Sequence, residues 1–135
     1  MSESSSHILL VQSLVAWVAE NFLGGDRGMI LIDSPYTVAS QKPPRIARFV
    51  PDVFVPSGFI GGMIIGEAKT DKDLERRHSL EQIDEFLLEC SRYDGSLFVL
   101  AVPWYNTRLA RAILREIQRR NAIQVNTIVI DKLPG

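Results

Sequence analysis

Hydrophobic residues recur along the first part of the chain with the spacing of a helix. From about residue 7 to residue 23 they form one stripe that is expected to be buried, made of Val11, Leu14, Val15, Val18 and Phe22. We expect this helix to end at Gly24-Gly25, because glycine readily adopts the left-handed conformation that closes helices. Ser5 or Ser6 could cap its start.

Three strands follow this helix in the prediction. Residues 29–32 form a short apolar run, residues 47–55 a second strand and residues 63–69 a third. Residues 34–44 are expected to be a loop, since adjacent prolines bar a helix there. Ser57-Gly58 is a predicted turn, so the second and third strands should form a hairpin.

Helices and strands also alternate in the second half of the chain. Helical spacing predicts a long helix over residues 72–91. Residues 96–102 form a continuous apolar run, which is typical of a strand covered on both faces. A third helix is expected from Asn106 or Thr107 to residue 121, and residues 125–130 form the last strand.

The resulting order, αβββαβαβ, predicts an α/β fold with a mixed central sheet flanked by helices. The 135 residues fit one domain, residues 1–135, and the 46% apolar and 23% charged residues are ordinary for a soluble protein. No apolar run reaches the roughly 20 residues that span a bilayer, and the first residues carry no basic leader. We therefore expect no membrane association. The single cysteine, Cys90, suits a reducing, cytoplasmic location.

Charge is distributed unevenly, although the net charge is only −1. Acidic residues crowd positions 71–89, whereas arginines crowd positions 108–120. One arginine stripe has helical spacing: Arg108, Arg111, Arg115 and Arg119. A solvated outer face is the favoured interpretation of this stripe. The alternatives are a face that contacts phosphates and a contact between subunits.

Two adjacent predicted strands carry charged residues within apolar sequence. Asp52 is the one carboxylate in the first of these strands, and Glu67 and Lys69 are two residues apart in the next. Side chains alternate between the faces of a strand, so Glu67 and Lys69 point the same way and Ala68 points to the opposite face. In a hairpin Asp52 can lie beside Glu67. Two carboxylates there repel each other and lose water, which a hard divalent cation such as Mg²⁺ would relieve.

This grouping suits the hydrolysis of phosphodiester bonds. A bound metal ion would polarise a phosphoryl oxygen and lower the pKa of a water molecule. Lys69 could orient or deprotonate that water, or stabilise charge at the phosphorus. The sequence therefore predicts a metal-dependent DNA endonuclease.

The segments Pro51-Asp52 and Glu67-Ala68-Lys69 together resemble the motif of the PD-(D/E)XK nuclease superfamily. The core order of that superfamily, αβββαβ, matches the chain as far as Val102. The resemblance implies a restriction-endonuclease-like core, with Holliday-junction resolvases among the members of similar size. It implies Mg²⁺ or Mn²⁺ bound by Asp52, Glu67 and the Ala68 carbonyl, with Lys69 assisting the attacking water.

The same resemblance implies further site residues. Family members often carry an acid on the first helix, where Glu20 stands, and a glutamine on the helix after the lysine, where Gln82 stands. Phe86 occupies the place of a tyrosine found in one subgroup. Cutting both strands usually needs two sites, so the resemblance also implies a homodimer or a larger DNA-processing complex.

Four arginines flank the presumed site in sequence and are candidates for contacts with the DNA backbone: Arg45, Arg48, Arg76 and Arg77. Other residues have plainer interpretations. His78 is expected on the surface, Asp33 at a turn, and Cys90 and Trp17 in the core. Trp104-Tyr105 could stack on a base, but packing is the favoured interpretation.

Less specific hypotheses stay open for the same residues. Glu67 and Lys69 could be an exposed pair without a role, and Glu20 could be a solvated helix residue. The domain could be a non-catalytic nucleic-acid-binding or assembly module. It could also be an α/β protein unrelated to nucleases, in which case Asp52 and Lys69 would lie far apart.

Overall fold

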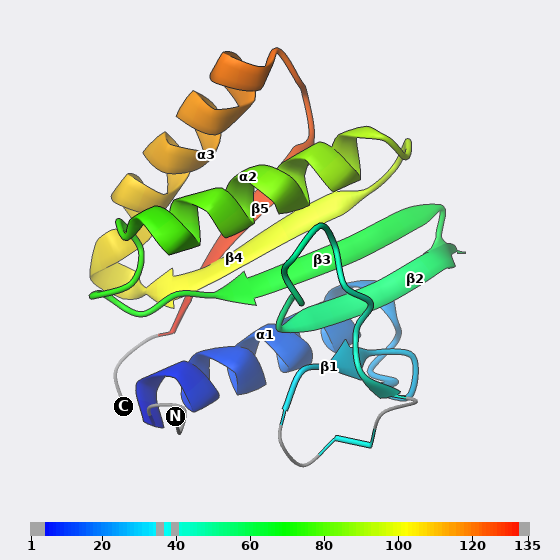
Figure 1. Cartoon of the computed structure of the whole chain (residues 1–135). Coiled ribbons are helices and arrows are strands. Elements are labelled where there is room, and N and C mark those ends of the chain that lie inside the picture. The colour runs from blue at the N-terminus through cyan, green and yellow to red at the C-terminus, as the bar shows by residue number, and fades with distance from the viewer. Residues whose placement is uncertain (1–4, 35–36, 39–40, 133–135) are drawn as a thin grey trace.

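The chain, described here from a computed structural model, folds into a mixed sheet between two layers of helices (Figure 1). The structure describes residues 5–34, 37–38 and 41–132. Its elements are α1 (Ser5–Phe22), β1 (Leu31–Ile32), β2 (Val53–Ile60), β3 (Gly62–Ala68), α2 (Arg77–Ser91), β4 (Leu97–Pro103), the short 3₁₀ helix η2 (Trp104–Asn106), α3 (Thr107–Asn121) and β5 (Asn126–Lys132). The predicted order αβββαβαβ and the α/β class are confirmed.

The sheet has the strand order β1-β2-β3-β4-β5. β1, β2 and β3 pair antiparallel, whereas β3, β4 and β5 pair parallel. Parallel neighbours need a crossover connection, and α2 and α3 provide the two crossovers. Both helices lie on one face of the sheet, and α1 lies on the other (Figure 1).

Two apolar cores lie on the two faces of the sheet. Ile65, Phe98 and Leu100 face α2 and α3, and Ile64 and Val99 face α1. Every residue of β3 is buried, and so is every residue of β4 before Pro103. Coverage on both faces explains the continuous apolar run that predicted β4.

The hairpin of β2 and β3 is confirmed, but its turn lies further along the chain than Ser57-Gly58. β2 continues to Ile60, which pairs with Gly62, and the turn falls at Gly61. The register shifts between Val55 and Ile60, so the expected turn signal marks an irregularity within the strand instead. Glycine suits both places, because Gly58 and Gly61 have φ values of +108° and +105°.

β2 also begins later than the prediction of residues 47–55. Ile46 and Phe49 form an isolated bridge around a tight turn at Ala47, whose φ is +54°. Pro51 has no amide hydrogen to give to a neighbouring strand. The β2 ladder therefore starts only at Val53, and Asp52 lies directly before the first residue of the strand.

α2 begins at Arg77 rather than at residue 72. Thr70 and Asp73 form local hydrogen bonds there: Thr70 Oγ1 donates to Asp73 Oδ2 at 3.0 Å, and the Asp73 amide donates to the Thr70 carbonyl at 3.0 Å. Such bonds compete with the helix, so residues 71–75 form turns. This turn segment borders the end of β3.

α3 has its predicted bounds, and the remaining elements begin and end within a few residues of their predicted ranges. α1 includes Ser5 and Ser6 instead of being capped by them, and Gly24-Gly25 ends it as expected, with the Gly25 amide donating to the Ala19 carbonyl at 2.8 Å. β1 keeps only two residues of the expected four. The predicted loop at residues 34–44 lies partly outside the described residues. Among the residues described, no helix combines the length and apolar character that crossing a bilayer requires.

Gly66, which precedes Glu67 in β3, lets α1 pack closely on the sheet. A Cβ atom at Gly66 would lie 2.9 Å from Leu14 Cδ2 and 3.2 Å from Val53 Cβ. Both distances are too short for ordinary packing. The absence of a side chain at Gly66 therefore sets how near α1 approaches.

We expect Gly66→Ala to lower the free energy of unfolding by about 1–3 kcal/mol, because the added methyl overpacks the core. In the double variant Gly66→Ala/Leu14→Ala the methyl enters the space that Leu14 vacates. The combined loss should then be smaller than the sum of the two single losses. Urea-induced unfolding measures all three values. Additive losses would contradict this packing.

Candidate functional site

Asp52 and Glu67 lie opposite each other where the β2–β3 ladder ends. Val53 pairs with Gly66, so the next pair outward is Asp52 and Glu67. The Asp52 amide donates a 2.8 Å hydrogen bond to Glu67 Oε1, and the Ala68 amide donates a 2.8 Å hydrogen bond to Asp52 Oδ2. Each carboxylate thus accepts a backbone N–H from the other strand. Both residues are nearly buried: the exposed fraction of Asp52 is 9% and that of Glu67 is 2%.

Lys69 extends this pair toward α2. Its Nζ lies 3.3 Å from Glu67 Oε2 and donates a hydrogen bond to Gln82 Oε1. The Lys69 amide donates to the Ala101 carbonyl at 3.0 Å, which fixes the main chain against β4. The expectation that Glu67 and Lys69 point the same way is met, while Ala68 packs in the core on the α1 face. The hypothesis that Asp52 and Lys69 lie far apart is not met, since both contact Glu67.

Two residues that the sequence analysis did not select also reach the site. His7, in the first turn of α1, places Nε2 3.3 Å from Asp52 Oδ2. The Asp33 amide donates to the Asp52 carbonyl at 2.9 Å. Burial, followed by the charge of Asp52, raises the pKa of Asp33. No spacing in the sequence relates positions 7, 33 and 52, so only the fold could have identified them.

These side chains line a cavity of about 430 Å³. Its lining includes His7, Asp33, Asp52, Glu67, Lys69 and Gln82, together with Arg76 and His78 near the start of α2. The lining residues Asp52, Glu67 and Lys69 place the cavity at the end of the sheet where β3 gives way to the turns before α2. Buried acids and a buried amine at such an opening are typical of a functional site.

The surroundings of Glu67 disfavour the ionised form of its carboxyl group. Its pKa is raised to about 8, first by burial and then by the charge of Asp52. Lys69 and the Asp52 amide act in the opposite direction but do not cancel these effects. One ammonium group is therefore too little positive charge for two carboxylates in this environment. A cation bound here would relieve the excess.

The donor chemistry of Asp52 and Glu67 fits a hard divalent cation, which prefers oxygen ligands. Within the part of the chain that the structure describes, no group of three or more histidine, cysteine, aspartate or glutamate side chains is placed to hold a metal ion. Mg²⁺ is often bound through one or two carboxylates, with water and substrate phosphate completing its shell. The pair is therefore compatible with Mg²⁺ but does not form a closed protein cage.

Glu20 does not join these carboxylates, contrary to the expectation from the first helix. It is exposed in the last turn of α1 and does not line the cavity. His7, in the first turn, stands at the site instead. His7 and Glu20 are 13 positions apart, which corresponds to roughly 20 Å of helix. The expectation placed an acidic residue at the wrong end of α1, because the direction in which α1 crosses the sheet cannot be read from its sequence.

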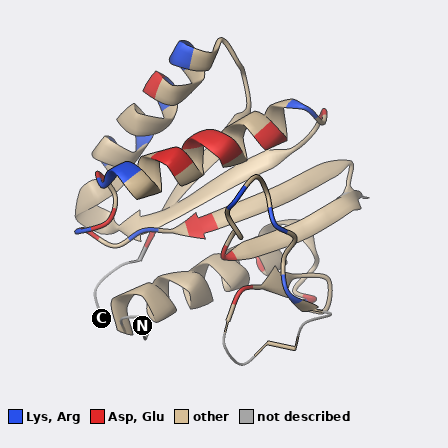
Figure 2. Ribbon diagram, viewed as in Figure 1, with Lys and Arg blue, Asp and Glu red and all other residues tan. Residues whose placement is uncertain are grey.

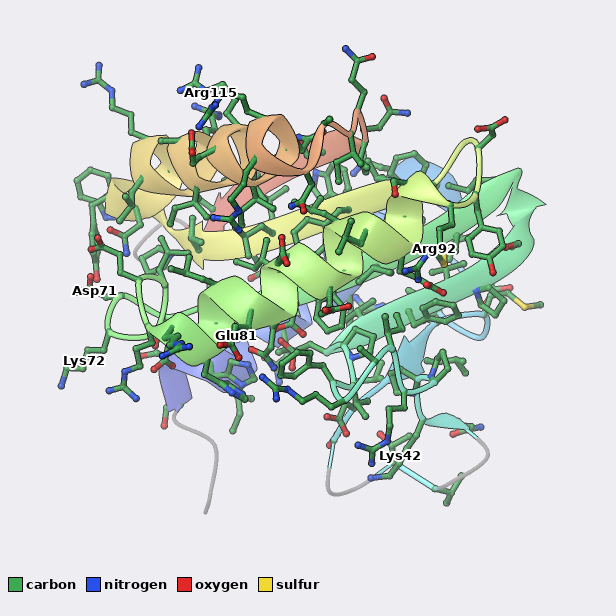
Figure 3. All side chains as sticks on the ribbon, turned by 45° about the horizontal axis from the view of Figure 1, so that its top comes forward. Lys42, Asp71, Lys72, Glu81, Arg92 and Arg115 are labelled. Carbon is green, nitrogen blue, oxygen red and sulfur yellow. The ribbon has the colours of Figure 1, made fainter. Side chains whose placement is uncertain are left out.

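The four flanking arginines are all exposed, but only Arg76 lines the cavity. Arg48 and Arg77 both pair with Glu81, which Figure 3 shows on the outer side of α2. The Arg45 guanidinium donates to the Arg48 carbonyl at 3.4 Å. Of these four arginines, Arg76 is thus the one at the cavity.

The remaining candidates have structural positions. Cys90 is buried in the core as expected, and Trp17 is half-buried against Phe22. His78 is exposed as expected, with its ring edge-on to Phe49. Trp104 and Tyr105 are not packed in the core, since they are 53% and 55% exposed.

Comparison with known proteins gives no match for this chain among family models, curated proteins or solved structures.

We expect the stability of the metal-free protein to fall as the pH rises from about 5 to about 9. The pKa of Glu67 is about 8 in the folded protein and near 4.5 in an unfolded chain. Between these two pKa values the folded state therefore holds a proton on Glu67 that the unfolded state has lost. The stability that depends on this protonated carboxyl is lost across the same interval, and the loss is complete once the pH exceeds the folded pKa.

Glu67→Gln should flatten this fall by an amount on the order of a few kcal/mol, because glutamine does not titrate. Urea-induced unfolding in EDTA across this pH range measures the effect. The control Glu20→Gln, at an exposed position, should keep the parent's pH dependence. An unchanged fall in Glu67→Gln would show that Glu67 is not the responsible group.

Proposed function

We propose that this protein is a metal-dependent nuclease that hydrolyses phosphodiester bonds of DNA, built on a restriction-endonuclease-like core of the PD-(D/E)XK kind. The observation that carries the proposal is the convergence of Asp52, Glu67 and Lys69 on one cavity at the end of the sheet. The interlocked hydrogen bonds between Asp52, Glu67 and the Ala68 amide hold that arrangement.

Asp52 and Glu67, with the Ala68 carbonyl, are the proposed ligands of Mg²⁺ or Mn²⁺. The bound ion would polarise a phosphoryl oxygen and lower the pKa of a water molecule. The main-chain hydrogen bonds fix the direction of both carboxylates before any ligand arrives, so little reorganisation is needed when substrate binds.

Lys69 is the proposed partner of the attacking water. Glu67 and Gln82 hold its ammonium group from two sides, which places the positive charge at the cavity wall. From there Lys69 can orient the water and stabilise negative charge that develops on the phosphorus oxygens. Gln82 acts by positioning Lys69.

DNA is the proposed partner, and exposed arginines are the proposed contacts with its backbone. Arg76 lies at the cavity itself. Arg45, Arg48 and Arg77 lie further out, where they can attract phosphates without reading the base sequence. Figure 2 shows acidic residues along α2, and a phosphate that reaches Arg48 or Arg77 would have to compete with Glu81 for them. A cytoplasmic location is part of the proposal and agrees with the free, buried Cys90.

One observation favours a second function, a non-catalytic nucleic-acid-binding or assembly module. Both carboxylates already accept backbone hydrogen bonds, and Lys69 already has two partners. The same contacts could serve only to stabilise the end of the sheet. Metal binding and cleavage distinguish the two functions.

We expect Asp52→Asn, Glu67→Gln and Lys69→Met each to lower the rate of DNA cleavage by about a hundredfold or more. The first two each remove a carboxylate proposed to bind the metal ion, and the third removes the ammonium group proposed to act on the water. Cleavage is measured over linear, nicked, flapped, branched and single-stranded DNA, with Mg²⁺ and with Mn²⁺. Glu20→Gln is the matched control and should cleave at the parent rate. A folded Lys69→Met variant as fast as the parent would overturn the assigned mechanism.

Divalent cations should stabilise the protein through the same carboxylates. At about ten times its dissociation constant, Mg²⁺ or Mn²⁺ should raise the free energy of unfolding by about 1.4 kcal/mol near pH 7.5. Chemical unfolding with and without the ion measures this gain. Asp52→Asn should lose it, while Glu20→Gln should keep it. A parent protein that gains nothing from either ion would favour the non-catalytic module.

A further inference from the structure

The two edges of the sheet differ in length. β1 forms one edge with only two residues. β5 forms the other edge with seven residues, Asn126–Lys132, and pairs with β4 along its whole length. Within the described residues, no strand pairs with the outer side of β5. A long unpaired edge offers a row of backbone donors and acceptors to another strand.

β5 lacks the features that usually protect an edge. It contains no proline, and its centre is the apolar run Ile128-Val129-Ile130, each residue of which is partly exposed. Charge appears only near the end, at Asp131 and Lys132. Proteins that keep an edge unpaired usually interrupt it with proline, bulges or central charges. β5 is therefore suited to pairing.

The register with β4 assigns the β5 side chains to the two faces. Thr127, Val129 and Asp131 lie opposite Phe98, Leu100 and Val102, which belong to the core under α2 and α3. Ile128 and Ile130 lie opposite Val99 and Ala101, which belong to the core under α1. Asp131 therefore shares the α3 face with Thr127.

A groove of about 250 Å³ runs between α3 and β5 on that face, lined by Arg111, Leu114, Arg115, Gln118, Thr127 and Val129. Arg111 and Arg115 are exposed, and Figure 3 shows Arg115 on the outer side of α3. Across the described residues, neither arginine forms an ion pair, whereas Arg119 pairs with Glu116 and Arg120 with Asp84. The groove thus presents unbalanced positive charge beside the edge.

We propose that β5 is the contact between two copies of this chain, paired antiparallel across a two-fold axis at Val129. In this arrangement the partner's Asp131 lies opposite Thr127, on the α3 face. Its carboxylate then lies beside the unpaired Arg111 and Arg115 of the groove. By symmetry the same contact forms twice. On the α1 face, Ile128 of each copy lies opposite the partner's Ile130, which removes both from water.

Val129 is the centre of the seven residues of β5, so pairing about it uses the whole strand. A shift of the axis by one residue shortens the pairing and moves the partner's Asp131 away from Thr127. The two sheets become one continuous sheet, and each copy keeps its own complete site near β3. Five strand spacings separate the two β3 strands, roughly 24 Å. The inference is independent of the proposed nuclease function and needs no DNA for its test.

Cysteine cross-linking tests the axis directly. In an antiparallel pair the two Val129 Cα atoms would be about 4.5–5.5 Å apart, within the range of a disulfide. V129C should form a covalent dimer on oxidation with diamide, as seen on a non-reducing gel. N126C is the matched control: it faces the partner's Lys132, so it should not cross-link. The native Cys90 is buried. Equal cross-linking of both variants, or none of V129C, would overturn the proposed axis.

Sedimentation of the full chain tests the charge contact. The parent should be a dimer, and Arg115→Asp or Asp131→Arg alone should raise its dissociation constant about tenfold or more, through like charges at the contact. The double variant Arg115→Asp/Asp131→Arg should recover dimerisation. Arg119→Asp, outside the groove, should leave it unchanged. Circular dichroism confirms that each variant is folded. A monomeric parent, or a dimer indifferent to the single reversals, would overturn the proposal.

Discussion

The structure of the site depends on the exchange of hydrogen bonds between two carboxylates and two backbone amides at the end of the β2–β3 ladder. Asp52 and Glu67 take the place of the next rung of the sheet, so the chain can end its pairing there without leaving amides unsatisfied. The same bonds orient both carboxylates. Because stability and site geometry rest on shared contacts, the acids cannot be moved without disturbing the end of the sheet.

Charge at this position is not balanced by the protein alone. Among the described residues, Lys69 is the one amine that contacts Glu67, and burial together with the charge of Asp52 still raises the pKa of that carboxyl. Gln82 keeps Lys69 at the wall of the cavity, and His7 approaches Asp52 from the opposite helix layer. Both helix layers therefore contribute to one site, and the sheet between them sets its register. A site of this kind fits the proposed cation and anionic substrate.

The antiparallel half and the parallel half of the mixed sheet have different roles. Its antiparallel half brings distant acids together within a hairpin, while its parallel half carries the crossover helices and ends in the open edge β5. Arg111 and Arg115 of α3 lie beside that edge rather than beside the acids. The basic stripe that is conspicuous in the sequence therefore belongs to a different surface from the site.

The sequence by itself determined the order of elements, the α/β class and the grouping of Asp52, Glu67 and Lys69, because periodicity and strand alternation are local properties. It did not determine where β2 and α2 begin, since Pro51 and the Thr70–Asp73 bonds act against the apolar pattern. Only the tertiary structure decided that His7 and not Glu20 reaches the site. The direction in which α1 crosses the sheet is set by packing between distant segments, which no local pattern encodes.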